Sequence, residues 1–369
     1  YAIEHGVNYF DTSPVYVQGW SEKATGDALK RHPRESYYVA TKLSNFSNPS
    51  REAAMAMYNR SFEELQVDYI DYYLLHSIGG GGMDNFRRRY VDNGMMDFLM
   101  EERKAGRIRH LGWSFHGGKD VFDAMLELHD QYHWDFVQIQ MNYVDWRIPK
   151  GSSIDAEYLY NELAKREIPV VIMEPLLGGR LSKVPDHVVS RLKQKSPESS
   201  VASWAFRFAG TPKYILTVLS GMAYMEPLQD NIRTYSPLIP LTEEENEYLY
   251  ETASIMEKYP TVPCTECKYC MPCPYGIDIP SIFLHYNKCV NEGNVPEDVQ
   301  DENYKEARRA FLVGYDRSVP KLRQANHCIG CRKCVSHCPQ RINIPRQLHR
   351  IDKFVEMLTQ DTLGVEDKG

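Results

Sequence analysis

The regular pattern of this chain begins in the stretch Gly6-Val7-Asn8-Tyr9-Phe10-Asp11-Thr12-Ser13-Pro14-Val15-Tyr16, an apolar run that ends in polar residues. Apolar and aromatic residues closed by a Ser-Pro turn predict a short buried strand that ends near Thr12. Similar runs recur to about residue 222. We expect strands at Val7–Thr12, Tyr37–Lys42, Tyr69–His76, Ile108–Phe115, Phe136–Asn142, Pro169–Glu174 and Ile215–Ser220.

Helical patterns lie between these strands, for example at Arg51–Leu65, Lys119–His129, Asp155–Arg166 and Ser199–Ala209. Strands that alternate with helices form βα units around a parallel sheet. The fold class predicted is therefore α/β, a (β/α)8 TIM barrel whose first strand is missing from this sequence. A doubly wound open sheet is the alternative, but no Gly-x-Gly-x-x-Gly follows the early strands, as a Rossmann domain requires.

Four polar side chains fall where predicted strands end, which is where barrels of this kind place their chemistry. They are Asp11, Tyr16, Lys42 and His76. An ion pair with Asp11 would hold the Lys42 ammonium beside the Tyr16 hydroxyl and lower the pKa of that phenol. Tyr16 would then protonate a developing alkoxide while His76 polarises the same oxygen. Each residue alone also has an ordinary structural role, but the four together favour hydride delivery to a carbonyl.

Eight of the nine cysteines form two tight runs. The first holds Cys264, Cys267, Cys270 and Cys273, and the second holds Cys328, Cys331, Cys334 and Cys338. The second run has the C-x2-C-x2-C-x3-C-P spacing of bacterial ferredoxins, and the first is one residue shorter at its last spacer. Thiolates are the ligands that iron–sulfur clusters prefer, so the runs predict two [4Fe–4S] clusters and electron transfer.

The proline-linked fourth cysteine of such a run ligates the other cluster in two-cluster ferredoxins. We therefore assign Cys338 to the cluster of the first run and Cys273 to the cluster of the second, with pairing inside each run as the alternative. Both runs continue as C-P-x-x-I-x-I-P, which predicts isoleucines packed against a cluster and a helix that starts at the second proline. Zinc is the competing metal, although this repeated motif is not a zinc signature. Cys289, outside the runs, is expected to be a small buried apolar residue.

The sequence also resembles the aldo-keto reductases, over residues 1 to about 235. The motifs that carry the resemblance are Gly6 to Tyr16, Ala40-Thr41-Lys42, Asp71-Tyr72-Tyr73-Leu74-Leu75-His76, Gly106-Arg107-Ile108-Arg109-His110-Leu111-Gly112-Trp113-Ser114 and Phe136-Val137-Gln138-Ile139-Gln140-Met141-Asn142-Tyr143. With the cysteine tail, the whole looks like the iron–sulfur branch of that family. The resemblance implies that Asp11, Tyr16, Lys42 and His76 are the catalytic tetrad, with Tyr16 as the proton donor.

The resemblance further implies a nicotinamide cofactor, NADP(H) or NAD(H). Ser114 and Gln138 match positions that hold the carboxamide, and Gly178, Gly179 and Leu181 match the pyrophosphate loop. Ser220, Gly221 and Asn231 match positions that contact the adenosine half. Phe115, Met173 and Pro227 depart from the usual residues, and Pro227 leaves the choice between NADPH and NADH open.

Composition excludes several classes of function. The net charge of −7 gives no nucleic-acid footprint, and no apolar stretch is long enough to span a membrane. We interpret the single basic run, Arg87-Arg88-Arg89, as a solvated loop face. Oxygen-sensitive clusters and free thiols favour the cytoplasm. Residue 1 is Tyr and lies in what reads as the end of a helix, so we expect the natural start to lie upstream.

Two domains are expected, a barrel at 1–237 and a helical 4Fe-4S ferredoxin-type domain at 238–369, with helices at Leu241–Lys258, Pro280–Glu292, Asp298–Val313 and Pro345–Thr359. The predicted function is reduction of a small-molecule carbonyl by NAD(P)H. A ferredoxin-type protein is a candidate redox partner for the clusters. The alternative is a redox-sensing or electron-transfer protein whose barrel binds nucleotide with little turnover.

Overall fold

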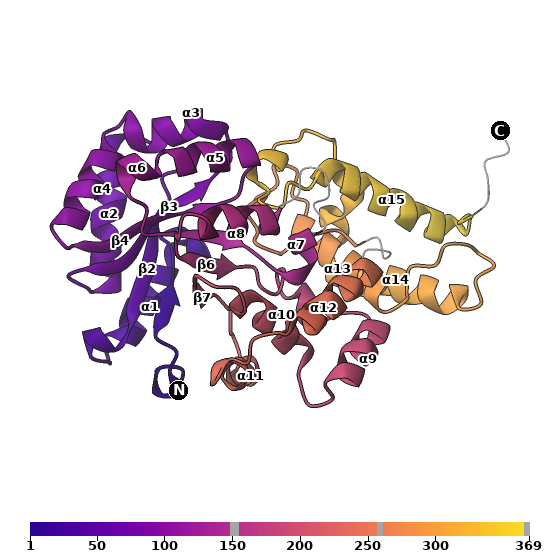
Figure 1. The fold of residues 1–369 in the computed structure, drawn as a ribbon. Helices are drawn as coiled ribbons and strands as arrows, with labels where there is room; N and C mark the ends of the chain where they lie inside the picture. Colours follow the sequence, from indigo (N-terminus) through magenta and orange to yellow (C-terminus); the bar gives the residue numbers. More distant parts are fainter. Residues whose placement is uncertain (148–154, 257–260, 365–369) are drawn as a thin grey trace. The chain divides into compact units, whose positions relative to one another are not determined.

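The computed structural model describes residues 1–147, 155–256 and 261–364, which form two compact units (Figure 1). The first unit contains Tyr1–Pro175 and Ser203–Glu243, and the second contains Leu176–Ala202 and Glu244–Gly369. The tail predicted from residue 238 thus makes up most of the second unit. That unit also includes Leu176–Ala202, which in chain order lies between two pieces of the first.

The first unit is built on a parallel sheet of seven strands that follow one another in chain order. The strands are β1 (Tyr9–Asp11), β2 (Tyr38–Leu43), β3 (Ile70–Ile78), β4 (Ile108–Phe115), β5 (Phe136–Gln140), β6 (Val170–Met173) and β7 (Ile215–Val218). All seven predicted strands are present. Their order, each strand paired with the next in parallel, is that of a nearly closed (β/α) barrel and confirms the predicted fold class.

Burial on both faces explains why these segments are mostly apolar instead of strictly alternating with polar residues. In β3 every residue except Ser77 is buried. One buried cluster joins residues from four strands, β2, β3, β5 and β6: Ala40, Tyr72, Leu74, Phe136 and Val171. The opposite faces are covered by helices, as when α2, α4 and α8 contact β2, β4 and β5 (Figure 1).

Four helices of the first unit, α2, α5, α8 and α10, lie at the predicted segments, and the full set is larger. The helices of this unit are α1 (Ser21–Leu29), α2 (Arg51–Leu65), α3 (Gly82–Phe86), α4 (Met95–Lys104), α5 (Lys119–Glu127), α6 (His129–Tyr132), α7 (Tyr143–Arg147), α8 (Ala156–Ala164), α10 (Val201–Gly210) and α11 (Met225–Tyr235). Helix α2 has the predicted bounds because the Ser50 side chain accepts a hydrogen bond from the Ala53 N–H and caps its start.

The second unit is helical in its described part, as predicted. Its helices are α9 (Asp186–Lys195), α12 (Glu243–Met256), α13 (Ile279–Asn291), α14 (Tyr304–Ser318) and α15 (Ile344–Gln360). The end of the predicted helix Leu241–Lys258 lies outside the described residues. Helix α14 begins later than expected because carboxylates hold the preceding residues in turns, where Asp298 accepts from the Gln300 N–H and Asp301 from the Glu297 N–H.

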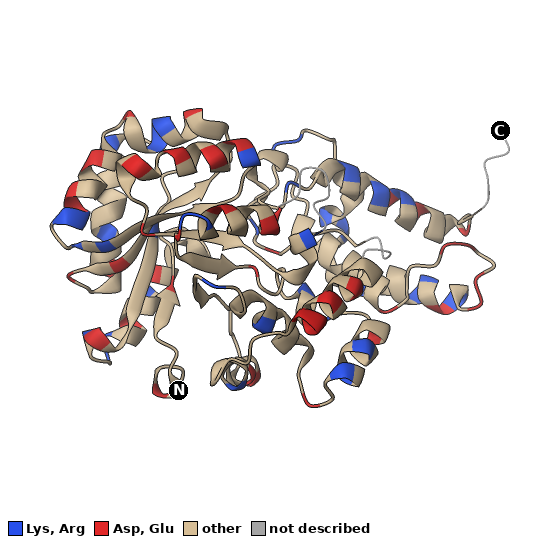
Figure 2. Ribbon diagram, in the orientation of Figure 1, with Lys and Arg blue, Asp and Glu red and all other residues tan. Residues whose placement is uncertain are grey.

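Charge explains why α9 belongs with the tail. Figure 2 shows acidic residues along α12, while the last turns of α9 are basic. Arg191 of α9 pairs with Glu251 of α12 at 2.6 Å, and Lys195 pairs with Glu244. The Arg191 guanidinium also stacks over the Tyr248 ring, 4.1 Å from its centroid. Within the described ranges, no helix combines the length and apolar character needed to cross a membrane.

Candidate active site and cluster-binding region

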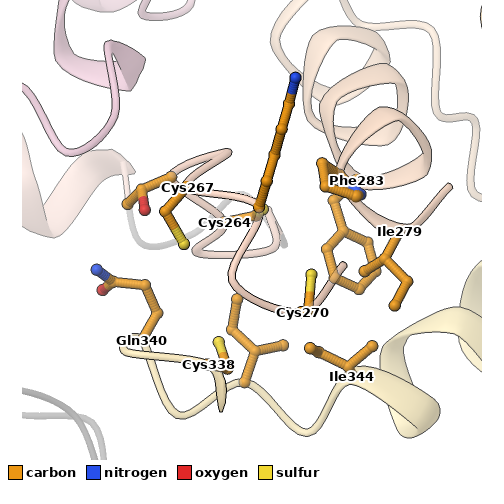
Figure 3. A pocket seen from close by; sticks show the side chains of 12 residues that line it. Cys264, Cys267, Cys270, Ile279, Phe283, Cys338, Gln340 and Ile344 are labelled. Carbon is orange, nitrogen blue, oxygen red and sulfur yellow. The ribbon is translucent and has the colours of Figure 1, made fainter. Parts of the chain in front are cut away.

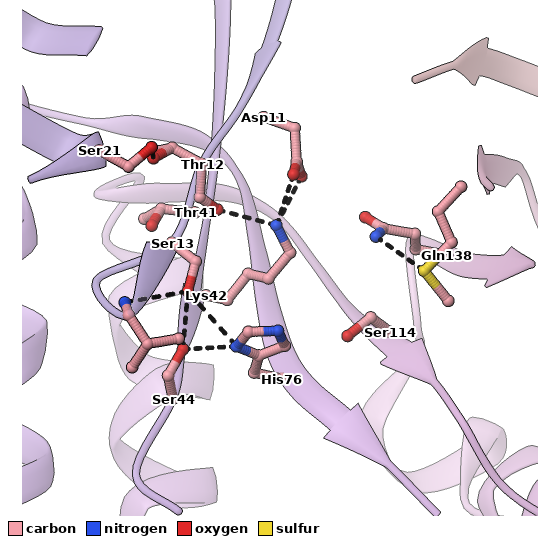
Figure 4. Close-up of polar contacts among 12 residues, drawn as sticks. Asp11, Thr12, Ser13, Ser21, Thr41, Lys42, Ser44, His76, Ser114 and Gln138 are labelled. Atoms are coloured by element: carbon pink, nitrogen blue, oxygen red, sulfur yellow. Dashed lines mark hydrogen bonds and ion pairs between the residues drawn. The ribbon is translucent and has the colours of Figure 1, made fainter. Parts of the chain in front are cut away.

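The ends of the first three strands bring Asp11, Lys42 and His76 of the predicted tetrad together (Figure 4). Lys42, buried in β2, donates hydrogen bonds to both carboxylate oxygens of Asp11 at 2.6 and 2.8 Å and to the Thr12 carbonyl at 2.8 Å. Burial raises the pKa of Asp11, and the Lys42 ammonium opposes that rise. The ammonium is therefore fixed in one place at the end of the sheet.

Tyr16 lies between the ammonium and the histidine. The Lys42 Nζ atom lies 4.8 Å from the centroid of the Tyr16 ring. The rings of Tyr16 and His76 meet edge to face with centroids 5.7 Å apart. The Tyr16 ring thus lies near both the Lys42 ammonium and the His76 imidazole.

Two serine hydroxyls contact the Nδ1 side of the His76 ring. The Ser44 Oγ lies 2.5 Å from the His76 Nδ1, and the Ser13 Oγ lies 3.4 Å from the same atom (Figure 4). Burial, together with the nearby Lys42 and Arg89 charges, holds the pKa of His76 well below its usual value of 6.5. A neutral imidazole that accepts at Nδ1 carries its proton on Nε2, where it can donate to a substrate oxygen.

The backbone of His76 is held by a residue pair that sequence reasoning missed. The Tyr90 hydroxyl accepts a hydrogen bond from the His76 N–H at 3.0 Å, and Arg89 Nη2 donates to the His76 carbonyl at 2.9 Å. Arg89 also donates to the Tyr90 hydroxyl at 2.6 Å. The interpretation of residues 87–89 as a solvated face is therefore wrong for Arg89, which is 1% exposed. A π-helical turn over Arg87–Val91 points this one arginine inward, and three adjacent arginines do not show which one will be buried.

Two positions predicted to hold the nicotinamide carboxamide lie on neighbouring strands β4 and β5. The Ser114 Oγ accepts a hydrogen bond from the Ser77 N–H at 2.8 Å. The Gln138 Nε2 contacts the Met173 sulfur at 3.4 Å, while its buried Oε1 has no partner among the described residues. A buried amide oxygen left unpaired is costly, and the amino group of a carboxamide would satisfy it. This part of the site therefore fits the cofactor.

The predicted adenosine contacts are also brought together in part. The Asn231 Nδ2 donates to the Ser220 Oγ at 3.0 Å, and Gly221 follows with open space where a side chain would be.

The predicted pyrophosphate loop contains Gly178, Gly179 and Leu181. Gly178 and Gly179 both have left-handed backbones, with φ of 66° and 86°, and Leu181 is fully buried. These three loop residues belong to the second unit.

The first three cysteines of the first run and the last cysteine of the second run line one pocket. Figure 3 shows Cys264, Cys267, Cys270 and Cys338 around it, with Ile279, Phe283 and Ile344 beside them. Burial raises the pKa of Cys270 to about 12, and the nearby Cys267, Cys264 and Cys338 add to this shift. The gathered thiols are the set predicted for one cluster, and isoleucines of both repeats, Ile279 and Ile344, line the same pocket.

The remaining four cysteines form the complementary set. Burial raises the pKa of Cys334 to about 11, with contributions from the nearby Cys328, Cys273 and Cys331. Cys273 thus lies with the second run, as cross-pairing requires. Cys289 is buried, as expected.

The two runs share a backbone conformation as well as a spacing. Glu266 and Gly330, which precede the second cysteine of each run, have φ of 57° and 73°. Lys268 and Arg332, which follow that cysteine, have φ of 63° and 61°. Left-handed residues in such turns aim successive N–H groups into one concavity, which suits an anionic iron–sulfur cluster.

The helices that follow also start alike. The side chain of Asp278 caps α13 and that of Asn343 caps α15, each with a proline in the first turn. The predicted proline-initiated helices are therefore confirmed, and the internal repeat extends through the caps.

The zinc alternative requires ligands that converge on one ion. Among the described residues, no three His, Cys, Asp or Glu side chains converge as ligands of a single metal ion, although four thiols line one pocket. Four zinc ligands meet at one atom about 2.3 Å from each sulfur, whereas the four irons of a cubane stand at separate corners. The arrangement fits a cluster better than zinc.

Residues 1–253 match the Aldo/keto reductase family. The chain belongs to this family. Residues 263–343 match the 4Fe-4S dicluster domain, so both parts of the resemblance seen in the sequence are confirmed. This aldo/keto reductase is an oxidoreductase with a 4Fe-4S region in its C-terminal part.

Similar proteins share the reductase part. L-galactose dehydrogenase of Arabidopsis thaliana is 28% identical over 69% of this chain and 82% of its own length. The uncharacterized oxidoreductase YqkF of Bacillus subtilis (strain 168) is 26% identical over 66% of this chain and 82% of its own length.

Solved structures show the same fold. The holo form of the aldo-keto reductase AKR11C1 from Bacillus halodurans has a TM-score of 0.55 at 22% identity, covering 68% of this chain and 84% of that one. An aldo/keto reductase from Klebsiella pneumoniae in complex with NADP and acetate has a TM-score of 0.54 at 20% identity, covering 68% and 81%.

Proposed function

We propose that this reductase transfers hydride from NAD(P)H to the carbonyl of a small aldehyde or ketone, with Tyr16 as the proton donor. The observation that carries the proposal is the buried Lys42 ammonium, bound by both Asp11 oxygens and placed 4.8 Å from the Tyr16 ring centroid. That ammonium stabilises the phenolate that remains when Tyr16 gives up its proton. The Asp11 and Thr12 oxygens keep it from turning away.

The neighbouring residues have supporting roles. His76 donates from Nε2 to the carbonyl oxygen, because its Nδ1 faces Ser44. A bound reduced nicotinamide supplies the hydride. Gln138 and Ser114 hold its carboxamide, Gly178, Gly179 and Leu181 line its pyrophosphate, and Ser220, Gly221 and Asn231 contact its adenosine half. The NADP in the Klebsiella pneumoniae complex supports NADP(H), the nucleotide with a 2′-phosphate. Pro227 leaves NAD(H) as the other candidate.

The cysteines hold two [4Fe–4S] clusters. Cys264, Cys267, Cys270 and Cys338 bind one, and Cys328, Cys331, Cys334 and Cys273 bind the other. The pocket of four thiols and the complementary grouping around Cys334 support this pairing. Bound clusters supply one-electron transfer, for which a ferredoxin-type protein is the proposed partner, and such oxygen-sensitive groups suit the cytoplasm.

The test of the catalytic role is Tyr16→Phe. We expect anaerobic carbonyl reduction to fall by roughly 100-fold or more, the contribution of a positioned general acid, with nucleotide binding retained. Tyr73→Phe makes the same chemical change at a buried tyrosine of β3 that packs against Tyr58 of α2, and it should leave turnover unchanged. Unchanged turnover in Tyr16→Phe would overturn the assignment.

A second experiment separates an enzyme from a redox sensor. Anaerobic NADPH or NADH is mixed with the cluster-loaded protein while test aldehydes, cluster absorbance and EPR are followed. Nucleotide oxidation by aldehydes with unchanged clusters is expected of a reductase whose clusters are structural or separately reduced. Bleaching of the clusters without carbonyl turnover would favour redox sensing.

A further inference from the structure

Thr265, between Cys264 and Cys267, has an unpaired buried hydroxyl. The residue is 8% exposed, and its Oγ1 has no hydrogen-bond partner among the described residues. A buried hydroxyl in that state costs on the order of 1–3 kcal/mol, so such groups are rare unless a ligand pairs them. Thr265 lines the same pocket as Cys264, Cys267, Cys270 and Cys338.

The sulfurs of a cluster are the acceptors that this pocket would offer. Hydrogen bonds to cluster sulfurs are among the factors that set the reduction potential. A donor stabilises the reduced cluster more than the oxidised one, because the reduced cluster carries one more negative charge. The matching position of the second run is Ile329, which is exposed and has no donor, so the two half-sites differ at this position.

The backbone of Thr265 lies directly against the glycine loop within the same unit. A Cβ on Gly178 would lie 2.5 Å from the Thr265 Cα and 2.8 Å from its carbonyl oxygen, so only glycine fits there. The Arg180 guanidinium of the loop donates to the Thr261 hydroxyl at 2.6 Å. The Asn291 side chain of α13 donates to the Lys183 carbonyl at 3.0 Å. The loop is thus attached at three points to the elements that surround the first set of thiols.

We propose that the Thr265 hydroxyl donates a hydrogen bond to a sulfur of the first cluster, and that the Gly178 loop controls this bond. The inference rests on the proposed function, which places a cluster at the four thiols and a nucleotide pyrophosphate at the loop. A ligand that moves Gly178 must move Thr265, because the two backbones are in contact. Nucleotide binding and cluster potential are then linked, and by reciprocity the redox state of the cluster alters nucleotide affinity.

The experiment is an anaerobic redox titration of the cluster-loaded protein, followed by EPR. We expect Thr265→Val to lower the potential of one cluster and leave the other unchanged, with about a tenfold change in the oxidised-to-reduced ratio, equal to 59 mV for one electron. Thr265→Ser keeps the donor and should titrate like the parent protein. Ile329→Val is the matched control in the second run and should shift neither cluster. Thr265→Ala also removes the donor but has a smaller side chain. It should therefore lower the same potential even where valine disturbs the packing.

The loop is tested with ADP-ribose, which contains the pyrophosphate but no redox-active ring. We expect it to shift the potential of the Thr265-dependent cluster in the parent protein and not in Thr265→Val. A parent-like titration of both Thr265→Val and Thr265→Ala would overturn the hydrogen bond. ADP-ribose that binds without any shift would overturn control by the loop. Absence of 4Fe–4S EPR signals, or of binding of both ADP-ribose and its 2′-phosphate, would overturn the proposed function itself.

Discussion

His76 is fixed by more residues than the catalytic tetrad contains. Its ring contacts Ser44 and Ser13, and both backbone polar groups are bound by the Arg89–Tyr90 pair. A guanidinium buried beside an imidazole also favours the neutral histidine, because two positive charges repel. Arg89 is therefore a positioning residue for His76, whose Nε2 is the proposed hydrogen-bond donor to the substrate oxygen.

Arg89→Met tests this role. We expect the pKa of His76 to rise, because a positive charge is removed, and kcat to fall by roughly tenfold, about 1.4 kcal/mol, with KM little changed. NMR titration of the His76 ring measures the pKa directly. Arg88→Met, at an exposed arginine of the same turn, is the control. A His76 titration identical in both variants would contradict the assignment.

The sequence predicts the proposed catalytic residues better than the residues that support them. Asp11, Tyr16, Lys42 and His76 stand at strand ends, where the barrel architecture itself assigns a role. The contacts of Arg89 and Thr265 depend on a π-helical turn and on the close approach of two distant segments. Neither feature leaves a periodic signal in the chain, so both emerge only from the folded structure.

At the scale of elements, each half-site repeats the same left-handed turns with different residues. Glu266 adopts φ of 57°, which costs a side-chain-bearing residue roughly 1 kcal/mol or more, whereas its counterpart Gly330 adopts φ of 73° without that cost. The space around Gly330 is open, so a methyl group there meets no other atom within 4 Å. Any effect of a side chain at Gly330 is therefore conformational.

Gly330→Ala and Glu266→Gly should change stability in opposite directions. We expect Gly330→Ala to lower the free energy of unfolding by about 1 kcal/mol, and Glu266→Gly to raise it by a few tenths, since the greater entropy of an unfolded glycine offsets part of the gain. Anaerobic urea titrations of the cluster-loaded proteins measure both changes. Changes of the same sign would show that the side chains, and not the backbone angles, decide the outcome.

The starts of four helices show which local signals decide where a helix begins. Ser50, Asp278 and Asn343 cap their helices, and these three starts lie within a residue or so of their predicted positions. Helix α14 starts later because Asp298 and Asp301 use their carboxylates to form turns, a competition that helical periodicity does not reveal.

At the scale of the whole molecule, Leu176–Ala202 belongs to the unit that holds the cysteines. Cluster loading should therefore order this segment. We expect anaerobic hydrogen exchange in residues 176–202 to slow on loading, while exchange in β2 to β5 stays the same. The comparison of metal-free and loaded protein measures this effect. Protection confined to residues after 261 would contradict it.

Acidification should weaken the barrel. Burial lowers the pKa of His116 to about 4 and holds that of His76 well below 6.5. The unfolded chain then binds protons that the folded chain does not as the pH falls from about 6.5 towards 4. The free energy of unfolding should fall across that range, by on the order of 3 kcal/mol for His116 alone.

Urea unfolding between pH 7 and pH 4 measures this dependence. His116→Gln should flatten it by removing one titrating group, whereas His349→Gln, at an exposed position of α15, should leave it unchanged. An equal slope in His116→Gln and the parent protein would contradict the assignment.

The discontinuous second unit also affects how the protein is made. Residues 176–202 leave the ribosome before Glu244 and well before Cys338, and at roughly 5–20 residues per second the delay is on the order of ten seconds. During that interval the basic helix α9 lacks its acidic partner α12, and the glycine loop lacks Thr265. A nascent chain halted before Cys264 would contain all seven strands and still expose this segment to proteases. In that case, the segment would be protected from proteases only after the cysteine region has been synthesised.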